Sequence, residues 1–189
     1  MSTPRHRTAP GTSYFVTTKC WQSRSIFQIP GNVEILVSIL FHYRERNAYL
    51  LHEFVVMPNH LHVLLTPSST TSLERSIQLI KGASSREIHK QRGHKVEIWQ
   101  QGFHDWTIRD EYDWATKAQY IVLNPVRAGL TQTPLDWPYS SASVKFELDP
   151  MPRKYLTSGA EAPTMPVLLP GLKPRPPKEK PMLPKERHL

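Results

Sequence analysis

The sequence feature that most constrains the fold is the stretch MPNHLHVLL at positions 57–65. Pro58 disfavours helical backbone at the residue before it, and Asn59 suits a tight turn, so one strand ends here and another begins. After the turn, histidine and aliphatic residues alternate, as in a strand with one face towards a core. Side chains at i and i+2 share a face, so His60 and His62 stand side by side with Cα atoms roughly 6–7 Å apart.

Two imidazoles on one face of a buried strand cost desolvation free energy unless something binds them. A divalent metal ion is one candidate, because neutral imidazole is a common metal ligand. The alternative is that each histidine hydrogen-bonds to neighbouring protein groups. The pattern H-x-H taken alone favours this alternative, so the choice depends on residues elsewhere in the chain.

The order of the predicted elements indicates an α+β fold. Stretches rich in β-branched and aromatic residues predict strands at 14–21, 48–57, 60–66 and within 98–108, after Gly102. Apolar residues at helical spacing predict helices at 33–47 after an Asn32 cap, at 72–91, and at 111–124 between Asp110 and Pro125. This order is βαββαβ, the ferredoxin-like arrangement with an antiparallel sheet, plus an added C-terminal helix.

Charge and proline content divide the chain into three parts. Residues 1–12 are polar and basic and are predicted to form a flexible arm, and residues 13–149 hold every predicted element. Residues 150–189 contain 10 prolines and 8 Lys/Arg against 3 Asp/Glu. Because such a segment cannot bury enough apolar surface to fold alone, we expect an extended basic tail.

The formal net charge of +8 indicates a polyanionic partner, with nucleic acid favoured over a membrane surface. Cys20 is the single cysteine, which excludes an internal disulfide and a cysteine-based zinc site. No apolar run approaches the roughly 20 residues that span a bilayer, and the N-terminus lacks the apolar region of a signal peptide. We therefore expect a cytoplasmic protein with no membrane partner.

The predicted third helix carries a second pair of polar residues on one face. Tyr120 and Asn124 are four residues apart, so a phenol and an amide point in the same direction. Asn124 could supply a third metal ligand, and Tyr120 a nucleophilic oxygen beside the metal. The alternative is that Tyr120 packs with its hydroxyl at the surface while Asn124 caps the helix end.

Taken together, the two stretches resemble the single-tyrosine HUH endonucleases, in which U is a hydrophobic residue, here Leu61. The segments VVMPNHLHVLLTP, GFHDWTIRDEYDWATKAQYIVLNPVRAGL and WPYSSA are similar to those of the bacterial REP-associated tyrosine transposases, relatives of insertion-sequence transposases. The resemblance runs from about Tyr14 to Val144, with both blocks in the order and spacing of the family. It implies the ferredoxin-like fold and an enzyme that acts on repeated palindromic DNA.

The resemblance also implies roles for four residues. His60 and His62 match the histidines that hold a divalent metal, Mg²⁺ or Mn²⁺, and Tyr120 matches the nucleophile. Asn124 stands where related enzymes place a Gln that completes the metal site, and it is one methylene shorter. The implied reaction cuts one DNA strand and leaves a 5′-phosphotyrosine and a free 3′-hydroxyl, which keeps the bond energy for rejoining. Two imidazoles are unusual for magnesium, so ligand preference alone does not exclude zinc.

The implied partner is single-stranded or hairpin DNA from repeated palindromes, bound by a monomer or homodimer at the nucleoid. Side chains that would contact phosphates, each with solvation as its alternative, are Lys81, Arg86, Arg109 and Arg127. The tryptophans could stack on unpaired bases, but Trp106 and three others are expected in the core. Two other functions stay open: a domesticated protein that grips hairpin DNA without cutting it, and an RNA-binding βαββαβ domain.

Overall fold

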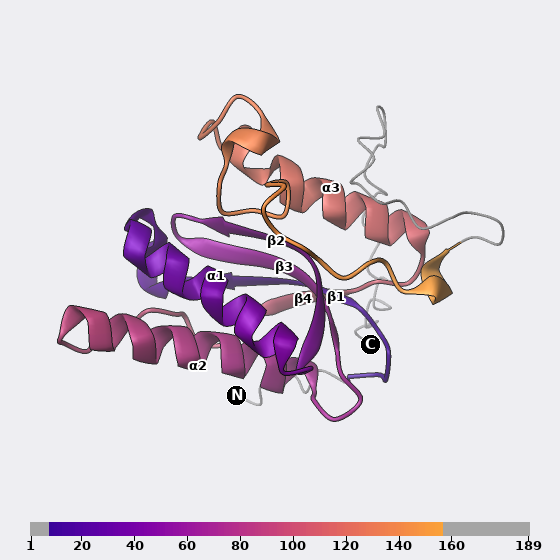
Figure 1. The fold of residues 1–189 in the computed structure, drawn as a ribbon, viewed down its shortest axis with the longest axis horizontal. Helices are drawn as coiled ribbons and strands as arrows, with labels where there is room; N and C mark the ends of the chain where they lie inside the picture. The colour runs from indigo at the N-terminus through magenta and orange to yellow at the C-terminus, as the bar shows by residue number, and fades with distance from the viewer. Residues whose placement is uncertain (1–7, 157–189) are drawn as a thin grey trace, which may run out of the picture.

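The computed structural model describes residues 8–156, in which a four-stranded sheet lies between two layers of helix (Figure 1). The strands pair antiparallel in the order β2-β3-β1-β4. They are β1 (Tyr14–Lys19), β2 (Tyr49–Met57), β3 (His60–Pro67) and β4 (His104–Thr107). The helices are α1 (Pro30–Glu45), α2 (Leu73–Arg92) and α3 (Glu111–Arg127). The predicted α+β class and βαββαβ order with an added helix are confirmed.

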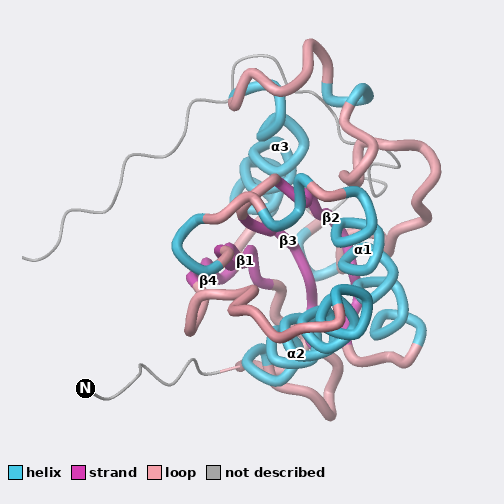
Figure 2. Tube along the Cα trace, turned by 90° about the vertical axis from the view of Figure 1, so that its left-hand side faces the viewer, coloured by secondary structure: helices cyan, strands magenta, loops and turns pink. Residues whose placement is uncertain are grey.

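The two faces of the sheet are covered by different helices. α1 and α2 lie on one face and α3 lies on the other, as the two perpendicular views show (Figures 1 and 2). Because side chains alternate along a strand, β3 sends Leu61, Val63 and Leu65 into the core under α1 and α2. Its even-numbered residues, including His60 and His62, therefore face α3.

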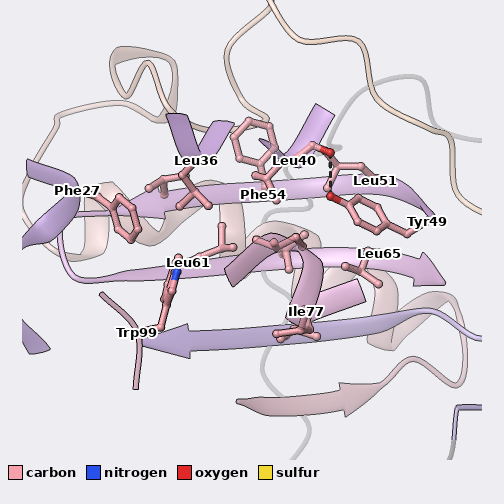
Figure 3. Close-up of a cluster of buried hydrophobic side chains, with 14 of the residues drawn as sticks. Phe27, Leu36, Leu40, Tyr49, Leu51, Phe54, Leu61, Leu65, Ile77 and Trp99 are labelled. Atoms are coloured by element: carbon pink, nitrogen blue, oxygen red, sulfur yellow. Dashed lines mark hydrogen bonds between the residues drawn. The ribbon is translucent and has the colours of Figure 1, made fainter. Parts of the chain in front are cut away.

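The larger core fills the space between the sheet and the helices α1 and α2. Leu36 and Leu40 of α1 and Phe54 of β2 are fully buried there (Figure 3). Tyr49 is buried beside them, and its hydroxyl donates a 2.8 Å hydrogen bond to the carbonyl of Leu40. That bond satisfies the one polar group that the ring carries into the core.

The start of α1 differs from the prediction. Asn32 is not the N-cap, because the helix begins two residues earlier, at Pro30, and Ile29 occupies the cap position. A proline in the first helical position has the required backbone angle and lacks a hydrogen that would be unsatisfied there. Asn32 is instead buried, and its amide donates to the carbonyl of Ile26 at 2.8 Å. The predicted cap Asp110 is confirmed, since it accepts a backbone N–H at the start of α3. Ser72, predicted as the first residue of its helix, is the N-cap of α2 and accepts the Arg75 amide.

The end of α3 also differs from the prediction, because the helix runs through Pro125 to Arg127. A proline in a helix removes one backbone hydrogen bond, but it does not prevent the residues after it from continuing the turn. Here the amides of Ala128 and Leu130 donate to the carbonyls of Asn124 and Pro125. Asn124 therefore stays inside the helix.

Parts of both predicted terminal segments pack on the domain. The Thr8 hydroxyl accepts the Leu73 amide at 2.8 Å, at the first turn of α2. Met151 and Tyr155 are buried against α3, and the Tyr155 hydroxyl accepts the Ser13 amide at 3.0 Å. The segment at the start of the predicted tail is therefore folded, because it supplies apolar side chains to the α3 core. Residues 1–7 and 157–189 lie outside the part of the chain that the structure describes.

In residues 8–156, no helix is long and apolar enough to cross a membrane.

The outer edge of β2 is covered by the segment that follows α3. Val56 donates its amide to the Tyr139 carbonyl, and the Ser141 hydroxyl donates to the carboxylate of Glu53. Burial raises the pKa of Glu53 to about 7, since a charged carboxylate is poorly solvated there. This side chain thus links the stability of the β2 edge to pH.

We expect the stability contributed by Glu53 to be present at low pH and to be lost as the pH rises through about 7. Relative to the variant Glu53→Gln, the wild-type free energy of unfolding should fall by on the order of 1–3 kcal/mol between about pH 5 and pH 8. Urea unfolding at several pH values measures this difference. Glu34→Gln, which changes an exposed carboxylate of α1, is the control and should show no such trend.

Candidate active site

His60 and His62 converge on one point beneath α3. Their Nε2 atoms lie 3.1 Å apart, and the two rings meet edge to face with centroids 4.6 Å apart. The Nδ1 atom of His60 is 2.6 Å from Oδ1 of Asn59, and the Nδ1 atom of His62 is 2.8 Å from Oγ1 of Thr17. An amide oxygen can only accept, so His60 carries its proton on Nδ1 and presents a lone pair at Nε2.

This geometry fits two ligands of one cation. If the Thr17 hydroxyl accepts a hydrogen bond from Nδ1 of His62, the Nε2 atom of His62 carries a lone pair, as that of His60 does. The two lone pairs then face each other over 3.1 Å, and a cation bound by both nitrogens would stabilise this arrangement. With bonds of roughly 2.0–2.1 Å to an ion, two neighbouring nitrogen ligands would lie about 3 Å apart. The neighbours of both rings thus orient them as partners of metal-ligating histidines do.

The environment keeps both rings neutral, which is the form that binds metal. Burial, together with the charges of His60, Lys117 and Lys19, lowers the pKa of His62 to about 3. Burial also lowers the pKa of His60, with Lys19 acting in the same direction, although a hydrogen bond with the Asn124 side chain opposes the shift. Both imidazoles therefore have pKa values below that of a free histidine and are neutral at neutral pH.

Tyr120 and Asn124 reach the histidines from α3. The Tyr120 ring meets the His62 ring edge to face at 5.2 Å, and Asn124 hydrogen-bonds to His60 through its side chain. Asn124 thus faces the site and does not cap the helix. The Tyr120 side chain is 37% exposed, and its hydroxyl has no hydrogen-bond partner among residues 8–156. The structure brings the four predicted site residues together.

The side chains present at the site determine which protein ligands a metal ion could have. In residues 8–156, no group of three His, Cys, Asp or Glu side chains could hold a metal ion. A third protein ligand beside the two histidines would therefore be a neutral oxygen donor, and the Asn124 amide is the side chain in contact with His60. A site of two imidazoles and one amide leaves positions open for other oxygen ligands.

Two cationic residues of the site were missed from the sequence. Lys19 lies directly across from His60 in the β1–β3 register, and Lys117 Nζ lies 5.1 Å from the ring of Phe15, which stacks on His62. Lys117 precedes Tyr120 by three residues, a helical spacing that the sequence shows. The position of Lys19 depends on strand register, which no local pattern reveals.

The four predicted phosphate contacts divide between the two sides of the sheet. Arg127 lies over the Tyr120 ring at 5.5 Å, and Arg109 lies over Trp106 at 5.4 Å while pairing with Asp113. Lys81 and Arg86 belong to α2, on the opposite face from the histidines (Figure 1). The Lys81 ammonium donates to the carbonyls of residues 100 and 102, and Arg86 pairs with its neighbour in sequence.

A family model described as "Transposase IS200 like" matches residues 12–124, more than half of the chain. The chain belongs to this family. The REP-associated tyrosine transposase of Escherichia coli K12 is 27% identical over 145 residues, which cover 75% of this chain and 82% of that protein. A Haemophilus influenzae protein assigned to the same group is 33% identical over 107 residues, which are 50% of this chain and 61% of the relative.

A solved structure described as a REP-associated tyrosine transposase bound to a REP hairpin has the same fold. It matches with a TM-score of 0.64 and 24% identity, over 85% of this chain and 98% of that one. The chain therefore spans nearly all of this neighbour, but only about three-fifths of the Haemophilus relative. The family resemblance expected from the sequence is confirmed.

We expect the histidine pair to be the metal-binding element. The double variant His60→Ala/His62→Ala should weaken Mn²⁺ binding by more than roughly 100-fold, because even the partners of metal ligands contribute 10- to 100-fold. Isothermal titration calorimetry measures the affinity, and circular dichroism verifies the fold. His104→Ala removes an exposed histidine that pairs across from Thr17 and should leave binding unchanged. Unaltered Mn²⁺ affinity in the double variant would show that the ion binds elsewhere.

Proposed function

We propose that this IS200-like transposase cuts and rejoins one strand of DNA beside a hairpin, with Tyr120 as the nucleophile. The observation that carries the proposal is the contact of Tyr120 and Asn124, one helical turn apart on α3, with the converging histidines. A nucleophile, two neutral imidazoles and an amide on one side of the sheet are the parts needed for metal-assisted phosphoryl transfer.

The chemistry follows from these groups. The phenolic oxygen of Tyr120 attacks phosphorus, the bond from phosphorus to the 3′-oxygen breaks, and a 5′-phosphotyrosine forms. The phenol loses one proton and the departing 3′-oxygen takes one up, so the strand ends in a 3′-hydroxyl. A divalent ion, Mg²⁺ or Mn²⁺, held by His60, His62 and Asn124 would polarise the phosphoryl oxygen and favour the ionised phenol. The reverse attack by a 3′-hydroxyl rejoins or transfers the strand.

The charge around the site supports a phosphate-bearing substrate. Lys19, Lys117 and Arg127 lie near the histidines and Tyr120, and no acidic side chain is among the groups that shift the pKa values of the two histidines. A hairpin is favoured because the solved structural neighbour is described as bound to a REP hairpin. Hairpin DNA next to a single-stranded cleavage site is therefore the substrate to test first.

The two other functions raised by the sequence are less well supported. An RNA-binding split βαβ domain stacks bases on exposed aromatic residues of its central strands. Here α3 lies over that face of the sheet, and Tyr120 packs against Phe15 of the central strand β1 at 5.7 Å. A protein that binds hairpins without cutting them would not need the two imidazoles oriented towards one point.

Replacing Tyr120 by Phe removes one oxygen and keeps the ring that packs on His62 and Phe15. Cleavage and the covalent protein–DNA adduct should both disappear, while hairpin binding should change by less than about 3-fold. The test uses a labelled hairpin with single-stranded flanks and Mn²⁺, and it follows the adduct on a denaturing gel.

Tyr112→Phe is the matched control, because Tyr112 lies on the same helix but roughly 12 Å along its axis from Tyr120. It should retain wild-type cleavage and adduct formation. If Tyr120→Phe still cuts at the wild-type rate, a water molecule or another tyrosine is the nucleophile and the proposal is wrong.

A further inference from the structure

A patch of aromatic and cationic side chains extends from the candidate site to the β4 edge of the sheet. We call it the β4 patch, and it consists of Phe15, Trp106, Arg109 and Lys117. Phe15 and Trp106 face each other across the β1–β4 pairing, and Trp106 is 44% exposed, although the sequence indicated a core residue. A large exposed indole on a four-residue edge strand is not explained by folding.

The cations of the patch differ in how they are held. Arg109 is fixed by Asp113, with Nε–Oδ2 at 2.7 Å and Nη2–Oδ1 at 3.2 Å. Lys117 Nζ lies 4.5 Å from the Trp106 ring and 5.1 Å from the Phe15 ring. It makes no hydrogen bond within residues 8–156, and the carboxylate of Asp113, which is paired with Arg109, attracts it only through space. Its three N–H donors are therefore available to an anion.

The patch is continuous with the site. Phe15 stacks on His62 with centroids 5.4 Å apart and meets the Tyr120 ring at 5.7 Å. Neighbouring strands lie about 4.8 Å apart, so Trp106 is on the order of 10 Å from Tyr120. Stacked nucleotides advance roughly 3.4 Å each, which places the patch within about three nucleotides of a phosphate at Tyr120.

We propose that the β4 patch binds the single strand next to the cleavage site, with one unpaired base stacked on Trp106 and the adjoining phosphate held by Lys117. The proposal rests on the function proposed above and adds the place where the strand is gripped. An exposed indole beside an unpaired ammonium matches the two parts of a nucleotide, a flat base and a charged phosphate. Duplex DNA would not offer its base faces, so the occupant is single-stranded.

The test measures binding in the Tyr120→Phe background, where the hairpin substrate with single-stranded flanks stays intact. Trp106→Ala should weaken binding roughly 5- to 150-fold, the range for losing one aromatic–base stack, and Trp106→Phe should recover part of it. Lys117→Gln should lower the slope of log affinity against log salt by roughly 0.7, the value for one phosphate on a single strand.

Two controls match these variants in chemistry. Trp21→Ala removes the other exposed tryptophan of residues 8–156, which lines the groove beside α2. Lys145→Gln removes a lysine that likewise lies over aromatic rings, 4.9 Å from Phe146. Both should leave affinity and salt slope unchanged.

Abasic sites placed one at a time in the flanks identify the stacked base. An abasic site at one position should weaken binding to the wild-type chain as much as Trp106→Ala does. The same abasic site should not weaken binding to the Trp106→Ala variant any further. If Trp106→Ala and Lys117→Gln bind as tightly as the controls, while the wild-type chain cuts the substrate, the patch is not the strand site and the proposed function stands. If the wild-type chain binds but never cuts, and both patch variants bind weakly, the patch is correct and the proposed cleavage is wrong.

Discussion

The contact between two neutral imidazoles under α3 is the interaction on which the rest of the site depends. Each Nε2 atom faces the other at 3.1 Å because Asn59 and Thr17 hold the opposite sides of the rings. Burial disfavours the charged form of both rings, so they stay in the neutral form that can ligate a cation. The fold must therefore supply both the burial and the orientation of the rings.

The fold supplies burial by fixing α3 against the sheet. Trp114 packs edge to face against His52 of β2 at 4.8 Å and lies 5.7 Å from Tyr155, which comes from the segment after the domain. Ile121 is fully buried on the same helix, beside Tyr120. Continuation of the helix through Pro125 keeps Asn124 in helical geometry, so that its side chain points along the same face as Tyr120. The apolar side of α3 thus determines where its polar side lies.

Most of the fold and four residues of the site, His60, His62, Tyr120 and Asn124, were predictable because they depend on local patterns. The hairpin turn at Pro58, the Asp110 cap, and the spacing of His60 and His62 are properties of short segments. The start of α1, the passage of α3 through Pro125 and the exposure of Trp106 each differ from their prediction. At the first two positions one local signal was outweighed by another nearby, since Pro30 starts α1 ahead of Asn32 and the amides after Pro125 continue the last turn of α3. The exposure of Trp106 depends on the place of β4 at the edge of the sheet. Lys19 lies at the site only because the β1–β3 register places it opposite His60. A one-residue shift of this register would place Lys19 on the other face of the sheet.

The β2 edge of the sheet is covered and the β4 edge is open, and an open edge leaves room for a polymeric substrate. The β2 edge is closed by residues after α3, since Val55 pairs with Ser140 and Val56 bonds to Tyr139. No strand within residues 8–156 covers the outer edge of β4, which is short and carries Trp106. A site enclosed on all sides could act on a small molecule but could not receive the middle of a strand. Because the 139–141 segment covers the β2 edge, β4 is the open edge of the sheet within residues 8–156, and the strand in the proposed reaction would leave the site past it.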